Sequence, residues 1–166
     1  SALTMSDVLD VMVSTVSKVV DSESINIMLV EGDSAKIIRK SGYREPSSQL
    51  SEVHIPSLFT LQSMRETQQA FVISDVRSDS RWVSLDNIEV RSFVGAPIVL
   101  KSEVIGFINL DSSKPHHFLD KHRQRLQAFA DQAAIAIENA QLYEASQRYT
   151  EDLRRANEEL QYEIII

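Results

Sequence analysis

The residues that this chain lacks narrow the chemistry open to it. It contains no cysteine, which excludes disulfides, thiolate metal sites, iron–sulfur clusters, thiol nucleophiles and thioether-linked chromophores. Its 17 Lys and Arg are outnumbered by 24 Asp and Glu, which gives a net charge of −7. Nucleic-acid phosphates require clusters of basic side chains, and the sequence has none. We therefore predict no nucleic-acid partner.

Long hydrophobic runs are also missing. A membrane-spanning helix needs an apolar run of about 18 residues, and no run in the sequence is close to that length. The chain also does not start with a signal-peptide pattern. We expect a cytoplasmic domain that does not itself insert into a membrane. A length of 166 residues with 43% hydrophobic content suits one domain with an appendage. The abrupt start and the ending "EIII" indicate a piece of a longer protein.

The first two thirds of the chain alternate between helical and strand patterns. In "TMSDVLDVMVSTVSKVV", Thr4 lies three residues before Asp7, which predicts a capping box at the start of an amphipathic helix. The β-branched runs "SINIMLV" and "AKIIRKSG" flank a turn at Gly32 and predict a hairpin. Pro56 introduces a short helix, "LFTLQSMRETQQ", which the strand "AFVIS" follows. A loop, "DVRSDSRWVSLDN", leads to a second hairpin, "SFVGAPIVL" and "EVIGFINL".

From about Leu119 onward no glycine or proline interrupts a helical pattern. A helix of this length is about 70 Å long, whereas a compact body of this size is only about 40 Å across, so the helix must leave the domain. It carries two apolar stripes on opposite sides. The first consists of Leu126, Phe129, Ala133, Ile137 and Ala140. We expect this stripe to cover the domain's own sheet.

The second stripe predicts a partner helix. It begins with Ala128, Ile135 and Leu142 and continues into the tail through Leu153 and Leu160. This spacing is typical of a coiled-coil seam, most simply with the same helix of a second copy in a parallel homodimer. Ion pairs at i,i+4 spacing in the tail, such as Arg154 with Glu158, add only a few tenths of a kcal/mol each.

The second position of the seam stays open. It is occupied either by Tyr149 and Ala156 or by Thr150 and Asn157. An asparagine on the seam would fix the register of the two helices at some cost in stability.

Several of these segments together resemble a known family. "SFVGAPIVLKSEVIGFINLDSSKPHHF" followed by "LQAFADQAAIAIENAQLYE" is similar to the last strands and closing helix of GAF domains, and "ISDVRSDSRW" resembles the loop before them. The resemblance covers about residues 3 to 145 and implies an α/β (α+β) fold, in which N- and C-terminal helices back an antiparallel sheet and a pocket lies on its other face. We expect a GAF-like sensory domain at 1–145, and at 146–166 the start of a coiled-coil signalling helix leading to an output domain.

The resemblance also allows specific family chemistries to be tested. Bilin-binding members commonly attach their chromophore through cysteine, and methionine-sulfoxide reductase members use catalytic cysteines, so both chemistries lack their necessary atom. Cyclic-nucleotide members carry Asn-Lys, then Phe, then Asp-Glu. Asn109 and Phe118 match this motif, but Leu110, His122 and Arg123 replace its Lys, Asp and Glu. Cyclic-nucleotide binding is therefore the less favoured ligand chemistry.

Three residues are predicted to bind a ligand: Trp82, Phe107 and Asn109. Alternation along "VIGFINLD" places Phe107 and Asn109 on the pocket side and Val104 and Gly106 on the face under the terminal helices, where Gly106 would allow a helix to approach closely. Asn109 is either a hydrogen-bond anchor for a ligand or a partner of loop backbone.

The loop before the second hairpin has two interpretations. In the functional one it forms a lid, with Trp82 against a ligand. In the structural one Asp75 and Asp79 cap turns, Arg81 forms an ion pair and Trp82 fills core.

The four histidines do not predict a metal site. His116 and His117 are adjacent and diverge in a loop, while His54 is distant in sequence and His122 is not one helical turn from His117. We predict no metal, and the sequence leaves any other cofactor unknown.

The leading functional hypothesis is a non-catalytic sensory and regulatory domain of a signal-transduction protein of the histidine kinase or nucleotide cyclase type. It would bind a small molecule and relay the signal through a dimeric helical bundle. The alternative is a dimerisation module with an empty pocket. A standalone enzyme is third, because no catalytic constellation stands out.

Overall fold

Two hairpins form the centre of a single antiparallel sheet. The computed structural model describes residues 3–43, 51–84 and 89–165, and its strands follow the order β3-β2-β1-β6-β5-β4. The strands are β1 Ser24–Glu31, β2 Ser34–Ser41, β3 Glu52–His54, β4 Phe71–Ile73, β5 Ser92–Leu100 and β6 Glu103–Ser112. The helices are α1 Met5–Val19, α2 Phe59–Thr67 and α3 Asp120–Ile165, with short 3-10 turns η1 Ile55–Ser57 and η2 Val76–Ser78. The predicted α/β fold, an antiparallel sheet backed by terminal helices, is confirmed.

The two hairpin turns differ in their chemistry. Gly32 turns the β1–β2 hairpin with a φ of 61°, as its sequence predicted. The β5–β6 hairpin turns at Lys101 and Ser102, which both adopt positive φ without being glycine. Two-residue turns with positive φ match the twist of the strands they join. The short strand β3, which pairs with β2, was not predicted.

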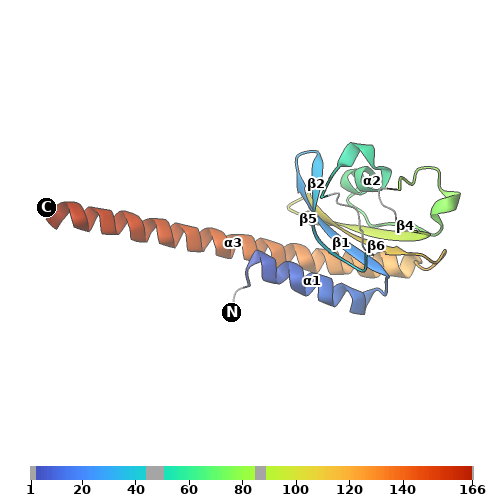
Figure 1. Ribbon diagram of the computed structural model, residues 1–166, viewed down its shortest axis with the longest axis horizontal. Helices are drawn as coiled ribbons and strands as arrows, with labels where there is room; N and C mark the ends of the chain where they lie inside the picture. The colour runs from blue at the N-terminus through green and yellow to red at the C-terminus, as the bar shows by residue number, and fades with distance from the viewer. Residues whose placement is uncertain (1–2, 44–50, 85–88, 166) are drawn as a thin grey trace.

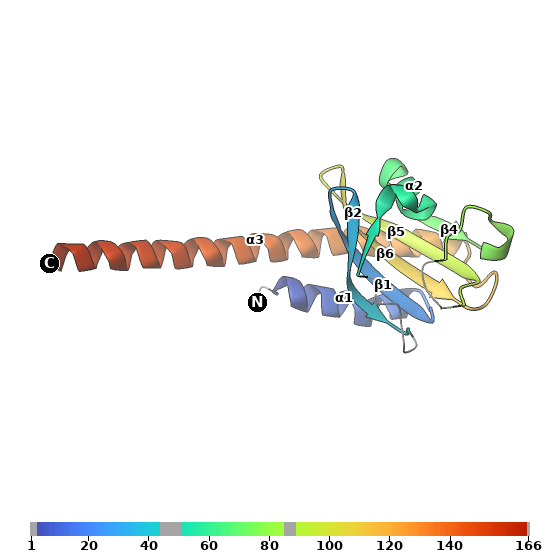
Figure 2. The same ribbon diagram turned by 45° about the horizontal axis from the view of Figure 1, so that its top comes forward.

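The sheet separates two apolar layers. Helices α1 and α3 lie side by side on one face, and α2 lies on the other (Figures 1 and 2). The first layer includes the fully buried Ile108 and Leu110, and the second includes Leu61, Met64 and Phe107. The central strands are thus covered on both sides, and polar groups on them must find partners within the protein.

Strand β6 contains an irregularity that corrects the sequence prediction for Val104. Ile98 pairs with Gly106 but Val99 pairs with Val104, so Ile105 is an extra residue. Such a bulge exchanges the faces of the residues before it. Val104 therefore packs in the α2 layer and Ile105 against the α1–α3 layer, the reverse of the expected arrangement.

The reason for a glycine at position 106 is also different from the one expected. A Cβ there would lie 2.5 Å from the carbonyl oxygen of Met28 in the neighbouring strand β1. The close approach is that of a strand backbone and not of a helix.

Helix α1 begins as predicted. Thr4 accepts a hydrogen bond from the backbone N–H of Asp7, and the Asp7 carboxylate accepts one from the backbone N–H of Thr4.

The loop predicted after β4 is mostly irregular with one 3-10 turn, and its residues 85–87 lie outside the described part of the chain.

Helix α3 has the two faces that its sequence predicted. Leu126, Ala133, Ile137 and Ala140 of the first stripe are buried against the sheet and α1, and Phe129 is half-buried. Ala128 of the second stripe is exposed. The other members, Ile135, Leu142, Leu153 and Leu160, are each more than half exposed.

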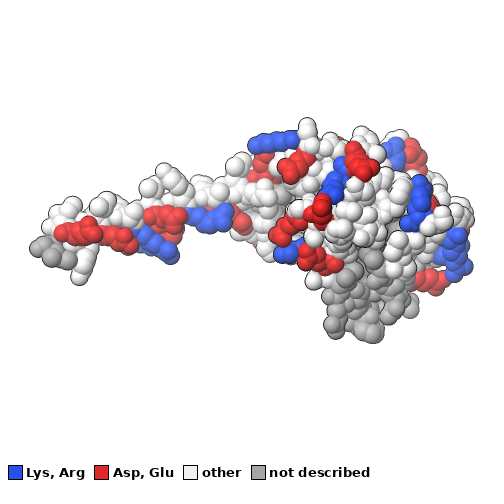
Figure 3. Space-filling model, turned by 90° about the horizontal axis from the view of Figure 1, so that it is seen from above, with Lys and Arg blue, Asp and Glu red and all other residues white. Residues whose placement is uncertain are grey.

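The second half of α3 projects from the body (Figure 1). Where α3 leaves the body, Glu144 Oε1 accepts a hydrogen bond of 3.0 Å from the Met5 backbone N–H. The tail carries the ion pairs of Arg154 with Glu151 and Glu158 and of Arg155 with Glu151. Figure 3 shows acidic and basic side chains interspersed along it. None of the helices in the described residues has the length and apolar character needed to cross a bilayer.

Candidate functional site

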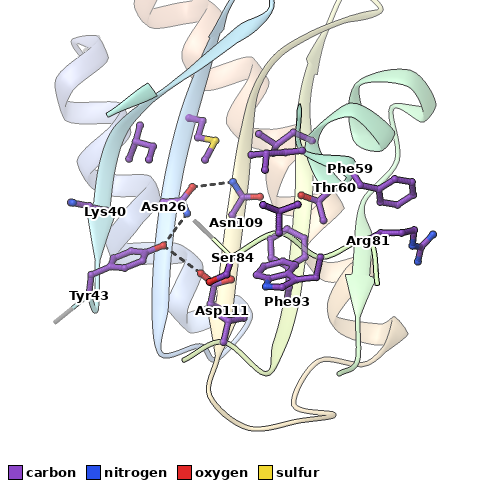
Figure 4. Close-up of a pocket in the computed structure, with 17 residues that line it drawn as sticks. Asn26, Lys40, Tyr43, Phe59, Thr60, Arg81, Ser84, Phe93, Asn109 and Asp111 are labelled. Atoms are coloured by element: carbon purple, nitrogen blue, oxygen red, sulfur yellow. Dashed lines mark hydrogen bonds between the residues drawn. The ribbon is translucent and has the colours of Figure 1, made fainter. Parts of the chain in front are cut away.

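A cavity lies on the α2 face of the sheet, opposite α1 and α3. Its volume is about 110 Å³, and it opens to solvent. One part of its wall is apolar and includes Met28, Ile37, Leu58, Phe59 and Phe93. The polar part is formed by Asn26, Tyr43, Asn109 and Asp111, with Lys40 nearby (Figure 4).

Two of the three predicted ligand-binding residues line this cavity. Trp82 and Asn109 are part of its wall. Phe107 is a correction: its side chain lies on the predicted side of the sheet, but it is fully buried in the apolar layer beneath α2 and is not a lining residue. It opposes Met28 across β1 and β6, and its role is to fill the core.

The aromatic side of the cavity is held by the segment after η2. Trp82 packs on Phe93 with ring centroids 5.3 Å apart. The Arg81 guanidinium lies 4.3 Å from the centre of the Phe59 ring, in the range of a cation–π contact. Phe59 in turn contacts Phe71 edge to face. The cavity wall therefore depends on a chain of aromatic contacts from β4 to the loop.

The aspartates of this loop have structural roles. Asp79 accepts hydrogen bonds from the Arg81 backbone N–H and guanidinium, and these bonds lower the pKa of Asp79 to about 2. Asp75 accepts from the Arg77 backbone N–H, which caps η2, and forms an ion pair with Arg91 at 3.0 Å. The capping interpretation holds for both carboxylates, while Trp82 both fills core and lines the cavity.

The polar end of the cavity is a series of hydrogen bonds that joins β1, β6 and the segment after β2. Asn109 Nδ2 donates to Asn26 Oδ1 at 2.9 Å, and Asn26 Nδ2 donates to the Tyr43 hydroxyl at 2.9 Å. The Tyr43 and Ser24 hydroxyls each donate to Asp111 Oδ2 at 3.4 Å. Asn26 and Asn109 are opposite each other in the β1–β6 register, so strand pairing itself aligns the two amides.

Burial perturbs both ionisable groups of this chain. Asp111 lies inside the protein, and the loss of water around its carboxyl raises its pKa to about 7, although the hydroxyls of Ser24 and Tyr43 act in the opposite direction. Burial is also the main cause that raises the pKa of Tyr43 above its usual range, and the Asp111 charge adds to it.

One polar atom at this end has no partner. Asn109 is 3% exposed, and its Oδ1 accepts no hydrogen bond from the residues that the structure describes. Gly95, its partner in β5, allows side chains to pack closely beside it: a Cβ at position 95 would lie 2.9 Å from this oxygen and 2.9 Å from the terminal methyl of Met64. An unsatisfied buried acceptor costs about 1–3 kcal/mol.

Sequence reasoning did not identify Asn26, Tyr43 or Asp111 as members of this hydrogen-bond series. Asn26 is a polar interruption in the apolar run from Ile25 to Val30, and Asp111 follows Asn109 at the two-residue spacing of one strand face. Both signals were available. Tyr43 follows the end of β2, and only the fold brings it to the site.

The rings of His54, His117 and His122 each contact another polar group of the protein. His117 Nε2 is 2.9 Å from the carbonyl oxygen of Asp21, and His54 Nδ1 is 2.9 Å from the Ser57 hydroxyl. The backbone N–H of Leu119 donates to His122 Nδ1. In the described ranges, no three His, Asp or Glu side chains are grouped as metal ligands would be.

The model of the GAF domain family matches residues 2–138. This chain belongs to the GAF family. The match contains the whole sheet, the cavity wall and most of the buried part of α3. No curated protein matches the chain in sequence.

Solved structures share the fold at low sequence identity. The GAF domain of a two-component sensor histidine kinase from Bacillus halodurans is 19% identical, with a TM-score of 0.66, and the match covers 86% of this chain and 99% of that one. Residues 122 to 287 of a methyl-accepting chemotaxis protein are 23% identical, with a TM-score of 0.68, over 85% of this chain and 93% of that one.

An enzyme also has this fold. Free methionine-R-sulfoxide reductase from Neisseria meningitidis, whose structure holds its substrate, is 13% identical, with a TM-score of 0.71, over 84% of this chain and 80% of that one. At such identities the likeness concerns the fold alone. GAF domains are generally regulatory, and sensory signalling proteins are among those that share this architecture.

The raised pKa of Asp111 predicts a pH-dependent stability. The folded state holds this proton more tightly than the unfolded state, whose Asp pKa is near 3.8, so the contribution is present below about pH 4 and is lost as pH rises towards 7. Asp111→Asn, which cannot ionise, should therefore gain stability relative to the parent by on the order of 4 kcal/mol between pH 4 and pH 8. Urea unfolding of both proteins across this range measures the difference. A difference that does not change with pH would show that Asp111 titrates normally.

Proposed function

We propose that this GAF domain is the non-catalytic sensory and regulatory domain of a larger cytoplasmic signal-transduction protein of the histidine kinase or nucleotide cyclase type. It binds a small molecule in the cavity on the α2 face of the sheet and relays binding through α3 in a dimeric helical bundle. The observation that carries this proposal is the cavity itself, with an unsatisfied buried acceptor, Asn109 Oδ1, at its polar end.

The cavity has the composition of a small-molecule site. It combines an apolar wall with a few convergent polar side chains, which is the usual arrangement for binding with orientation. Trp82 and Phe93 supply flat surfaces for an apolar or aromatic body. Asn109 supplies a hydrogen-bonding group that a ligand would satisfy.

The route from the cavity to α3 is short. Asn109 and Asp111 face the cavity, and Leu110 between them is fully buried in the layer that contains Leu126 and Ile137 of α3. Helix α3 packs mainly on β5, the strand beside β6. A ligand that shifts this part of β6 would therefore act on α3 through the apolar layer that they share. Packed interfaces of this kind respond by small shifts or rotations of a helix.

The exposed stripe of α3 supports a second copy as the partner. With Tyr149 and Ala156 as the second seam position, alternating spacings of three and four residues run unbroken from Leu142 through Leu153 to Leu160, as in a continuous coiled coil. With Thr150 and Asn157 the repeat would be interrupted after Ser146. We therefore place Tyr149, which is 67% exposed, on the seam.

A dimerisation module with an empty pocket is the second candidate, supported by the same stripe. Cyclic-nucleotide binding is less favoured because Leu110, His122 and Arg123 replace the family's charged residues. A reductase role lacks the cysteine that the family chemistry uses. Both remaining candidates share the dimer and differ only in the ligand.

The ligand is tested by thermal unfolding with a metabolite and fragment library, together with native mass spectrometry of gently purified protein. A ligand at about 100 times its dissociation constant should stabilise the domain by about 2.7 kcal/mol. Trp82→Ala and Asn109→Leu should reduce this shift, whereas Asp7→Asn on the distant helix α1 should not. If no compound shifts the unfolding temperature and no small molecule co-purifies, the empty-pocket candidate is supported instead.

The dimer is tested by two neighbouring substitutions on α3. Ile135→Glu should abolish the dimer, because it places two like charges in an apolar seam, while the fold is kept since Ile135 is 56% exposed. Ile137→Glu should instead unfold the domain, because Ile137 is fully buried. Light scattering and circular dichroism measure both effects. A dimeric Ile135→Glu protein would show that this stripe faces something else.

A further inference from the structure

The hydrogen-bond chain at the polar end of the cavity has a direction. Asn109 donates to Asn26, Asn26 donates to Tyr43 and Tyr43 donates to Asp111. Each of these groups donates a hydrogen bond to the next group in the direction of Asp111 (Figure 4). The series of hydrogen bonds therefore ends at the cavity with an acceptor, Asn109 Oδ1. This oxygen lies on the side of the amide opposite Asn26.

An ionised Asp111 fixes this direction. A carboxylate only accepts hydrogen bonds, so the Tyr43 hydroxyl must give it its single proton and accept from Asn26. A protonated Asp111 can instead donate to Tyr43. The chain then reverses if both amides turn by 180°, which exchanges groups of nearly equal shape, and Asn109 presents an N–H to the cavity.

We propose, resting on the ligand-binding function above, that the cavity selects a small, mainly apolar ligand with an N–H donor for Asn109 Oδ1, and that ionised Asp111 favours its binding through Tyr43 and Asn26. The ligand class is a planar heterocycle or amide with one such donor. Aromatic surface from Trp82 and Phe93 takes the body, and the unsatisfied acceptor takes the N–H.

The side chains that cover Asn109 Oδ1 can move to admit such a ligand. The atoms that converge on the space beside it are the terminal methyl of Met64 and the edge of the Phe93 ring. Methionine is unbranched and changes rotamer readily. A ligand reaches the oxygen by displacing this methyl group, and it removes the cost of the unsatisfied acceptor.

The groups around Asp111 determine the pH at which it is protonated and the hydrogen bonds change direction. The groups that act on its pKa are its own burial and the hydroxyls of Ser24 on β1 and Tyr43 after β2. Phe93 opposes it on β5. Lys40 on β2 also lines the cavity and lies 6.0 Å from the centre of the Tyr43 ring. The pKa of about 7 places the change of direction near neutral pH.

The test uses two probes of the same shape, indole with its N–H and benzofuran with an oxygen in its place. Their dissociation constants for the full chain are measured by NMR titration between pH 5.5 and pH 8.5. Indole should bind about fivefold more tightly than benzofuran at pH 8.5, the worth of one net hydrogen bond. This preference for indole should decrease as pH falls through about 7. Protonated Asp111 no longer requires the hydrogen bonds to run in one direction, so Asn109 can turn an N–H towards the cavity.

Two variants separate this coupling from direct contact with Asp111. Tyr43→Phe should keep the binding of indole but lose its pH dependence, because the chain is cut between Asp111 and Asn26. Asp111→Asn should lose the pH dependence as well. A pH dependence that survives in Tyr43→Phe would overturn the chain. Equal binding of both probes would overturn the N–H selectivity while leaving the ligand-binding function in place. Binding of neither probe, together with a blank library screen, would overturn both.

Discussion

The coverage of strand β6 on both faces is the constraint on which the rest of the structure depends. Apolar layers under α1–α3 and under α2 exclude water from its central residues, including Asn109 and Asp111. Polar groups in such a place must be satisfied internally or remain costly. The pairing of β6 with β1 brings Asn26 opposite Asn109. The segment that follows β2 brings Tyr43 within hydrogen-bonding distance of Asn26. The result is a connected polar network with one group left open, at the cavity.

The same coverage connects the cavity to the projecting helix. Residues that alternate along β6 face the cavity and the α3 layer in turn, so displacement of one set displaces the other. Helix α3 is continuous from this layer to the exposed tail, and a tight core transmits small shifts without absorbing them. The pocket on one side of the sheet and the projecting helix on the other are thus connected through one packed core.

Much of the fold could be predicted from the sequence because its determinants are local. Thr4 and Asp7 specify a helix start, Gly32 a turn, and the apolar stripes of α3 a buried and an exposed face. Alternation and the family resemblance pointed to Asn109 and Trp82, and both line the cavity. The features that the sequence did not predict are non-local. The bulge at Ile105 depends on pairing with β5, and the position of Tyr43 depends on the path of the backbone after β2. Phe107 lies on the predicted side of the sheet but not in the cavity wall, because alternation along a strand does not give the depth of a side chain in the layer.

The central claim is that protonation of Asp111 sets the direction of hydrogen bonds as far as Asn109. It is tested most directly by NMR of the ligand-free protein, following the Asp111 carboxyl carbon and the side-chain amide groups of Asn26 and Asn109 through a pH titration. The account predicts that all three titrate together with one midpoint near 7. An Asp111 carboxyl that titrates near 4, or amide signals that do not change while Asp111 titrates, would contradict it.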